Sequence, residues 1–244
     1  MTSSFDKAQH IREEHGISMV SSHLKEVVYA GTDGIVTTFA VVAGFAGVNI
    51  NPTSTLPIMT VLLFGLANLF ADGLSMGLGD FLSQRAENEM FNYHKGIELN
   101  EIKTNPDHEA KETIELLIEK GFSKTDAIDI TKIYQKNPEY WAEFMMKYEL
   151  DMHNAETSSP AKSGLITFFS FASFGFLPIM PYLIFATPKT AFFSACTMSI
   201  IALAILGAFR AKVANQKLIR SIAETLLVGS LAGTTAYLVG ILFG

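Results

Sequence analysis

The sequence is poor in cysteine and in basic residues. Its one cysteine, Cys196, cannot form a disulfide within the chain, and a single thiol in an apolar run is expected to pack rather than to bind metal. Lysine and arginine number 18 against 24 acidic residues, and the formal net charge of −6 argues against a nucleic-acid partner. A phosphate loop of the G-x-x-x-x-G-K-S/T type is also missing, so we expect any energy to come from an ion gradient rather than from ATP.

Long apolar runs are what the chain has instead. Hydrophobic residues make up 49% of it, too many for an ordinary soluble protein. Five runs approach or reach the roughly 20 residues that cross a bilayer. They cover about residues 27–48, 57–80, 164–186, 190–209 and 222–243. Residues 1–26 are polar and lack the features of a cleavable signal peptide. We therefore predict an all-α polytopic membrane protein with five transmembrane helices.

Lysine and arginine are distributed unevenly between the predicted loops. The link after the fourth run carries four of them, whereas the loop at residues 187–190 carries one. By the positive-inside rule that link is cytoplasmic, as are the N-terminal tail and the segment between the second and third runs. The predicted organisation is a cytoplasmic tail at 1–26, transmembrane helices 1 and 2 at 27–81, a cytoplasmic helical insert at 82–161, and transmembrane helices 3 to 5 at 162–244.

A polar stripe runs through the second apolar run. Asn68, Asp72, Met76 and Asp80 follow one another at four-residue spacing, so they share one face of a helix. A carboxylate in hydrocarbon costs about 3 kcal/mol even on the lenient insertion scale, so such residues face a bundle interior or a water-filled path. The stripe predicts an ion route, and the soft Met76 thioether favours a transition metal over Mg²⁺ or Ca²⁺. The alternative for Met76 is ordinary packing between helices.

The first run contains one ionisable residue, Asp33. An intramembrane carboxylate is by default a functional candidate. An Asp beside Gly34 could instead cap a broken helix, and that structural alternative stays open.

Capping signals predict helices throughout the insert. The first helix continues the second run to about Lys103, and further helices begin at Asn105, Ser123 and Asn137. Two pairs of acidic residues lie on either side of the turn at Asn105. The members of each pair are three residues apart, so they share a helix face, and the turn could bring the two pairs together. They are Glu98 with Glu101 and Glu109 with Glu112, and Met145, Met146 and Glu149 follow on the last helix. Converging carboxylates need cations, so a multi-metal site is one interpretation. A solvated acidic face, with methionines that fill a core, is the other.

Two membrane segments resemble the vacuolar iron transporter family, which also has bacterial members. They are GTDGIVTTFAVVAG at Gly31–Gly44 and ADGLSMGLGDFLS at Ala71–Ser83. The acidic pattern of the insert is similar as well, whereas the segment Glu115–Tyr140 departs from the plant pattern by an added helix.

The resemblance implies a homodimer that moves Fe²⁺ out of the cytosol in exchange for protons, with no resident cofactor and no enzymatic activity. It implies the vacuolar membrane in a eukaryote and the cell membrane in a bacterium. Asp33 and Met76 correspond to the transmembrane metal ligands. Glu98, Glu101, Glu109, Glu112, Met145, Met146 and Glu149 correspond to the cytoplasmic metal-binding set. Proton binding at Asp33, with Asp72 or Asp80 as partners, would then weaken the metal site and release iron.

Three other functions remain open from the sequence. Mn²⁺ accepts the same carboxylates and could be the principal cargo. A membrane-anchored, ferroxidase-like iron protein is a second alternative, although di-iron bundles usually carry Glu-x-x-His and this insert has Glu-x-x-Glu. A purely structural membrane protein is a third, and it leaves the intramembrane polar stripe unexplained.

Overall fold

The computed structural model describes residues 23–48, 58–152 and 159–243. Within these ranges the chain forms helices and no strand, so the predicted all-α class is confirmed. The contacts divide the chain into a membrane unit, residues 1–80 with 161–244, and an insert, residues 81–160. The predicted N-terminal tail lies almost wholly outside the described residues.

Five of the described helices are long and apolar enough to cross a membrane, which confirms the five predicted spans. They are α3 (Leu24–Val48), α4 (Ile58–Thr104), α8 (Pro160–Ile184), α9 (Pro188–Val213) and α10 (Leu218–Phe243). Only the N-terminal part of α4 belongs to the membrane unit, because the helix continues into the insert as the sequence predicts.

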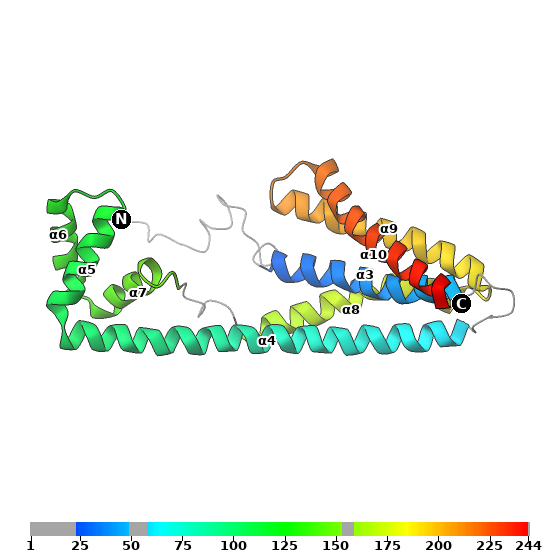
Figure 1. The fold of residues 1–244 in the computed structure, drawn as a ribbon, viewed down its shortest axis with the longest axis horizontal. Coiled ribbons are helices and arrows are strands. Elements are labelled where there is room, and N and C mark those ends of the chain that lie inside the picture. Colours follow the sequence, from blue (N-terminus) through cyan, green and yellow to red (C-terminus); the bar gives the residue numbers. More distant parts are fainter. Residues whose placement is uncertain (1–22, 49–57, 153–158, 244) are drawn as a thin grey trace, which may run out of the picture. The chain divides into compact units, whose positions relative to one another are not determined.

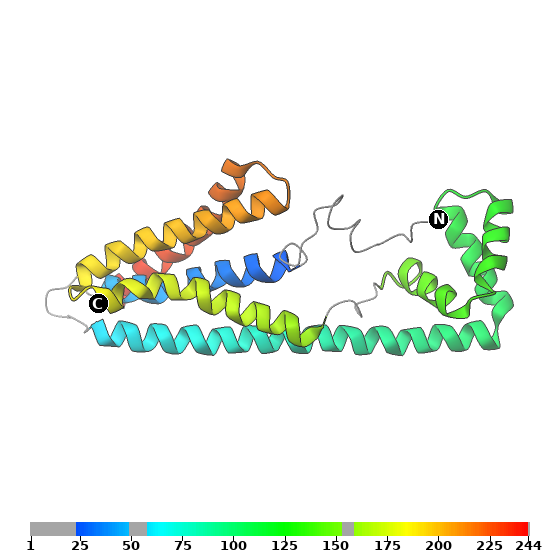
Figure 2. The same cartoon turned by 180° about the vertical axis from the view of Figure 1, so that it is seen from behind.

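Glycines let the helices of the membrane unit approach closely. A Cβ at Gly77 on α4 would lie 2.8 Å from the carbonyl oxygen of Gly164 on α8, and one at Gly175 on α8 would lie 2.7 Å from that of Gly34 on α3. The two views agree that α8 lies along the N-terminal part of α4 (Figures 1 and 2). Small residues at a helix interface are how backbones come close in a membrane, and here α8 contacts both α3 and α4 through them.

The insert consists of the end of α4 followed by α5 (Pro106–Glu119), α6 (Lys124–Tyr134) and α7 (Pro138–Tyr148). Ser123 and Asn137 cap their helices through their side chains, as predicted. Asn105 also stands at the predicted N-cap, but its backbone carbonyl rather than its side chain accepts from the next turn. Gly121 ends α5 with φ +98°, a left-handed conformation that glycine adopts without strain. Helix α6 lies within the segment Glu115–Tyr140, where the sequence predicted an extra helix.

A compact apolar core holds the insert together. Trp141 of α7 lies at its centre, and its indole N–H donates to the Thr113 hydroxyl of α5 at 2.7 Å. Ile102, Leu117, Ala127 and Phe144 bring α4, α5, α6 and α7 to the same core. On the outside, Lys95 of α4 forms ion pairs with two glutamates of α7. The insert therefore fixes the end of α4, the start of α5 and all of α7 relative to one another.

Candidate metal-binding sites

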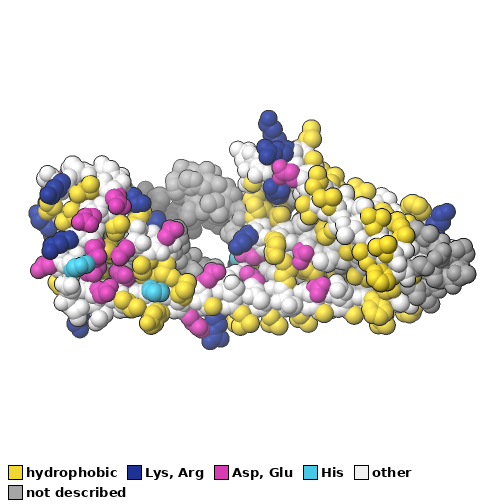
Figure 3. Space-filling model, in the orientation of Figure 1, with side chains coloured by type: hydrophobic (Ala, Val, Ile, Leu, Met, Phe, Trp, Pro, Cys, Tyr) yellow, Lys and Arg dark blue, Asp and Glu magenta, His cyan; other side chains and the backbone are white. Residues whose placement is uncertain are grey.

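The turn between α4 and α5 brings the two predicted glutamate pairs together. Helix α4 ends where the Asn105 amide donates to the Glu101 carbonyl at 2.8 Å, and α5 begins directly afterwards at Pro106. Two of the four glutamates face inward. Glu98 is 5% exposed and Glu109 is 4% exposed, although carboxylates are rarely buried without a partner. Figure 3 shows acidic side chains gathered on the insert, with histidine among them.

The carboxylates of this acidic cluster are close enough to affect one another's ionisation. Burial raises the pKa of Glu98 to about 7, helped by the charges of Glu149, Glu109, Glu101 and Glu112. Burial likewise raises the pKa of Glu109 to about 7, helped by the charges of Glu112, Glu101 and Glu149, while His108 acts to lower it. The pKa of Glu149, at the end of α7, is also raised by burial and then by Glu112 and Glu101. The structure therefore joins all five glutamates in one cluster.

The inner carboxylates lack the partners that burial demands. One oxygen of Glu98 and one oxygen of Glu109 are buried and accept no hydrogen bond from any described residue. An unpaired buried carboxylate must either take up a proton or find a cation. The cluster thus has a buried floor, formed by the unsatisfied carboxylates of Glu98 and Glu109. Its other three glutamates, Glu101, Glu112 and Glu149, form a more exposed rim.

Both methionines of α7 are fully buried beside this cluster. Met145 sulfur lies 3.3 Å from the Thr113 hydroxyl, which also lies 2.8 Å from the Glu109 carbonyl oxygen. A thioether sulfur has two lone pairs, so the one hydroxyl proton leaves at least one lone pair of the Met145 sulfur free. Met145 also belongs to the apolar core, so its two predicted roles are compatible. Met146 is equally buried.

In the membrane unit, the polar stripe of α4 lies at the edge of the helix packing. Asn68, Asp72, Met76 and Asp80 are each half-buried, beside a buried row that includes Leu69. Asp80 accepts a hydrogen bond from the Thr167 hydroxyl at 3.0 Å. Met76 packs against Ala30, Leu69 and Phe171. The four residues share one face, as predicted, and that face is only half covered within this chain.

Asp33 lies on an unbroken helix, so the alternative that it caps a broken one is wrong. Helix α3 runs continuously through it, and the Thr37 hydroxyl donates to its backbone carbonyl at 2.8 Å. Its carboxylate interacts electrostatically with Asp72 of α4. Asp33 also lines a groove of about 740 Å³ between α3, α9 and α10, whereas Asn68 lines a separate apolar groove.

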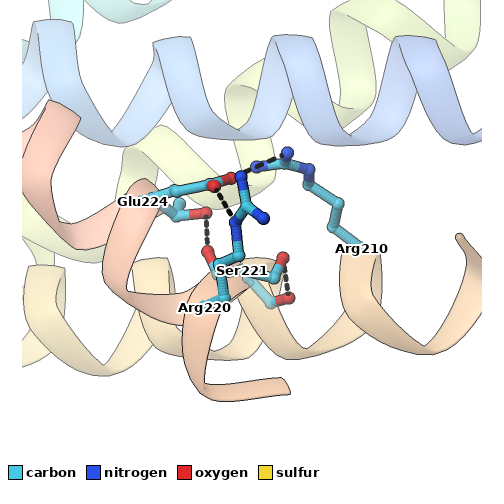
Figure 4. A network of polar contacts seen from close by, with 6 residues as sticks. Arg210, Arg220, Ser221 and Glu224 are labelled. Atoms are coloured by element: carbon cyan, nitrogen blue, oxygen red, sulfur yellow. Dashed lines mark hydrogen bonds and ion pairs between the residues drawn. The ribbon is translucent and has the colours of Figure 1, made fainter. Parts of the chain in front are cut away.

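Charged residues at one end of the Asp33 groove are paired with each other. Glu224 accepts from Arg220 at 2.9 Å, as its spacing predicts, and from Arg210 of α9 at 3.1 Å (Figure 4). This three-residue network joins α9 to α10, and it satisfies Glu224 without a metal.

A family model described as the VIT family matches residues 24–241. The chain belongs to the VIT family. A vacuolar iron transporter of Toxoplasma gondii is 36% identical over 93% of this chain and 76% of its own length. One of Plasmodium falciparum is 31% identical over 95% of this chain and 87% of its own length, and vacuolar iron transporter 1 of Arabidopsis thaliana is 27% identical over 88% and 83%. These relatives are transporters rather than enzymes.

The residues that the family model matches include both the acidic cluster and the polar stripe. Sequence reasoning did not single out one residue beside the acidic cluster, His108. His108 Nδ1 lies 3.2 Å from a carboxylate oxygen of Glu112, at the rim of the acidic cluster. His108, Glu109 and Glu112 offer three ligand atoms within 4.8 Å of one another. The signal was present as His-Glu-x-x-Glu, which places all three on adjacent turns of one helix.

Proposed function

We propose that the protein is a divalent transition-metal transporter that moves Fe²⁺ out of the cytosol in exchange for protons. The observation that carries the proposal is the acidic cluster, in which Glu98 and Glu109 each hold a buried, unpartnered oxygen. The family and the names of the relatives support iron as the cargo.

The insert captures metal at the cytosolic face. Its five glutamates repel one another when ionised, and a divalent cation relieves that repulsion as well as the burial of Glu98 and Glu109. Met145 and Met146 supply soft ligands next to the hard ones, which suits Fe²⁺ better than Mg²⁺ or Ca²⁺. The positive-inside pattern supports a cytosolic position for the insert and the N-terminal tail.

The metal then crosses along Asp33, Asp72 and Met76, between two copies of the chain. The half-covered state of the stripe supports a homodimer, because an intramembrane carboxylate left at the lipid surface is costly. A second copy would cover the face and bring a second Asp33, so that two carboxylates offset the charge of one Fe²⁺.

Proton exchange follows from competition for the same oxygens. Metal ligands must be deprotonated, so an acidic compartment beyond the membrane favours release. Asp33 is the main site of this competition, with Asp72 and Asp80 as its partners. The membrane is that of a vacuole or the cell membrane, depending on the organism.

Mn²⁺ is the second candidate cargo. The predominance of carboxylates in the cluster favours it, since Mn²⁺ prefers oxygen ligands and gains less from methionine sulfur.

The test is metal uptake by proteoliposomes under reducing conditions, with and without an acidic lumen. Asp33→Asn removes the charge at constant shape, and Thr235→Ala is the control because its hydroxyl bonds only within α10, to the Leu231 carbonyl. We expect gradient-driven Fe²⁺ uptake in the natural protein and in Thr235→Ala, and a fall of roughly 10- to 100-fold in Asp33→Asn. Metal that binds but never crosses, with or without a gradient, would contradict transport.

A further inference from the structure

His108 places an imidazole beside the acidic cluster of the insert, close to Glu109 and Glu112. It stands on the first turn of α5, directly before the buried Glu109. Its side chain is 60% exposed, so the imidazole can rotate without disturbing the core. Among the described residues, His108, Glu109 and Glu112 form the single group of three His, Cys, Asp or Glu ligand atoms that lie within 4.8 Å of one another.

A second observation points to a ligand at the same place. The Glu109 side chain is buried to more than nine-tenths and one of its oxygens accepts no hydrogen bond from the described residues. Its charge interacts with His108 and Glu112, which places the carboxylate among them. A cation would therefore meet an unsatisfied oxygen at the base and the imidazole at the rim.

The spacing between imidazole and carboxylate suits metal coordination. His108 Nδ1 and Glu112 Oε2 are 3.2 Å apart. Two ligands with bonds of about 2.1 Å that meet the metal at a right angle lie about 3.0 Å apart. The pair could share a cation after a small rotation of either side chain.

We propose that His108 is a metal ligand that makes the acidic cluster a mixed nitrogen and oxygen site, selective for later first-row divalent metals over Mn²⁺. Imidazole favours Fe²⁺, Co²⁺, Ni²⁺ and Zn²⁺, whereas carboxylates alone suit Mn²⁺ and Mg²⁺. This proposal rests on one part of the proposed function, that the insert binds metal. Under it, the insert already discriminates between metals when it binds them, before they reach the membrane path.

The same contact could be an ordinary pair on one helix face, with a protonated His108 held by Glu112. Such an i, i+4 pair on an exposed surface contributes little to stability and has no preference among metals. Substitution by glutamine separates the two roles. His108→Gln keeps a hydrogen-bond donor near Glu112 but removes the nitrogen lone pair that a metal needs.

The experiment is calorimetric titration of the full-length protein in detergent with Co²⁺ and with Mn²⁺. His94→Gln is the matched control, since His94 also lies in the insert and its ring meets the edge of Tyr93. We expect His108→Gln to weaken Co²⁺ binding about tenfold and Mn²⁺ binding less than about threefold, and His94→Gln to change neither. Equal losses for both metals, an equal loss in His94→Gln, or no loss at all would overturn the proposal.

A third variant separates this proposal from the proposed function. Glu98→Gln with Glu109→Gln removes both buried charges and should abolish Co²⁺ binding to the insert whatever His108 does. If that double variant binds Co²⁺ as the natural protein does, the acidic cluster is not the metal site and both proposals fail. If binding is lost there but unchanged in His108→Gln, only the role of His108 is contradicted.

Discussion

The acidic cluster of the insert and the polar stripe of the membrane unit differ in how completely one chain builds them. In the insert, a core centred on Trp141 joins four helices, α4 to α7, and Glu98 and Glu109 are each buried with one unpartnered oxygen. In the membrane, the residues of the stripe remain half-buried and Asp80 is satisfied by Thr167. One chain therefore assembles the acidic cluster completely, whereas it leaves the face of the polar stripe half covered.

The largest expected effect comes from removing the floor of the acidic cluster. Glu98→Gln with Glu109→Gln should weaken Fe²⁺ binding about 100-fold or more, because both buried negative charges are lost. Uptake by proteoliposomes at saturating metal should continue, since the membrane residues are untouched. Titration and uptake on the same preparation check both parts, and loss of uptake at all metal concentrations would show that the two sites do not act separately.

A pH dependence of stability should distinguish the insert without metal. Glu98 and Glu109 have a pKa of about 7 in the folded protein against 4.5 for an ordinary glutamate, so the folded state holds protons that the unfolded chain releases. Stability is therefore greatest below pH 4.5 with respect to these groups and falls as the pH rises to about 7. The loss is up to about 3 kcal/mol for one such carboxylate.

Thermal unfolding at pH 5 and at pH 8 measures this loss, followed by the fluorescence of Trp141, the one tryptophan of the chain. Fe²⁺ or Co²⁺ should restore stability at pH 8 and have little effect at pH 5, where protons occupy the oxygens. The Glu98→Gln, Glu109→Gln variant should show a much smaller difference between the two pH values. A metal effect that is equal at both pH values would argue against competition between protons and metal.

Met76→Leu probes the soft ligand of the membrane stripe. The substitution keeps the volume that packs against Leu69 and Phe171, so the fold should be preserved. If the thioether binds the cargo, uptake of Fe²⁺ should fall about tenfold and that of Mn²⁺ by less. Met90→Leu, at an exposed methionine of the insert part of α4, is the matched control. If Met76→Leu takes up Fe²⁺ and Mn²⁺ as well as the natural protein does, Met76 has a packing role only.

The hydrogen-bonded chain from Trp141 through Thr113 to Met145 offers a subtler test of the insert. Trp141→Phe removes the indole donor to the buried Thr113 hydroxyl and should destabilise the insert by about 1 to 3 kcal/mol. Co²⁺ affinity should fall severalfold because the α5 turn beside Met145 and Glu109 is less firmly held. Thr131→Val is a control that removes a buried hydroxyl bonded only within α6, to the Ala127 carbonyl.

The sequence was informative where local rules decide the structure. Ser123 and Asn137 cap helices because their side chains bond backbone amides three residues on, and four-residue spacing alone places Asp72 and Met76 on one face. Spacing also grouped Glu98 with Glu101, but it could not tell which of them is buried. That depends on where α7 docks, some forty residues later, and so on tertiary packing.

His108 was missed for a related reason. An exposed histidine in an acidic helix looks like any solvated residue, and the usual di-iron pattern places histidine after glutamate rather than before it. Its significance depends on the burial of Glu109, which the sequence does not show. The sequence also could not exclude that Asp33 caps a broken helix. Only the structure shows that α3 continues unbroken through that residue.

The smallest effect is expected at Glu224, which lines the same groove as Asp33. If it were a metal ligand at the entrance to the membrane path, Glu224→Gln would lower uptake at limiting Fe²⁺. Its two oxygens are instead held by Arg210 and Arg220, so a cation would have to displace two guanidinium groups. We therefore expect Glu224→Gln to leave uptake unchanged, with Asp33→Asn measured in parallel as the variant that loses it. A fall in uptake that appears only at low Fe²⁺ would place Glu224 on the path and extend the proposed membrane route to the N-terminal part of α10.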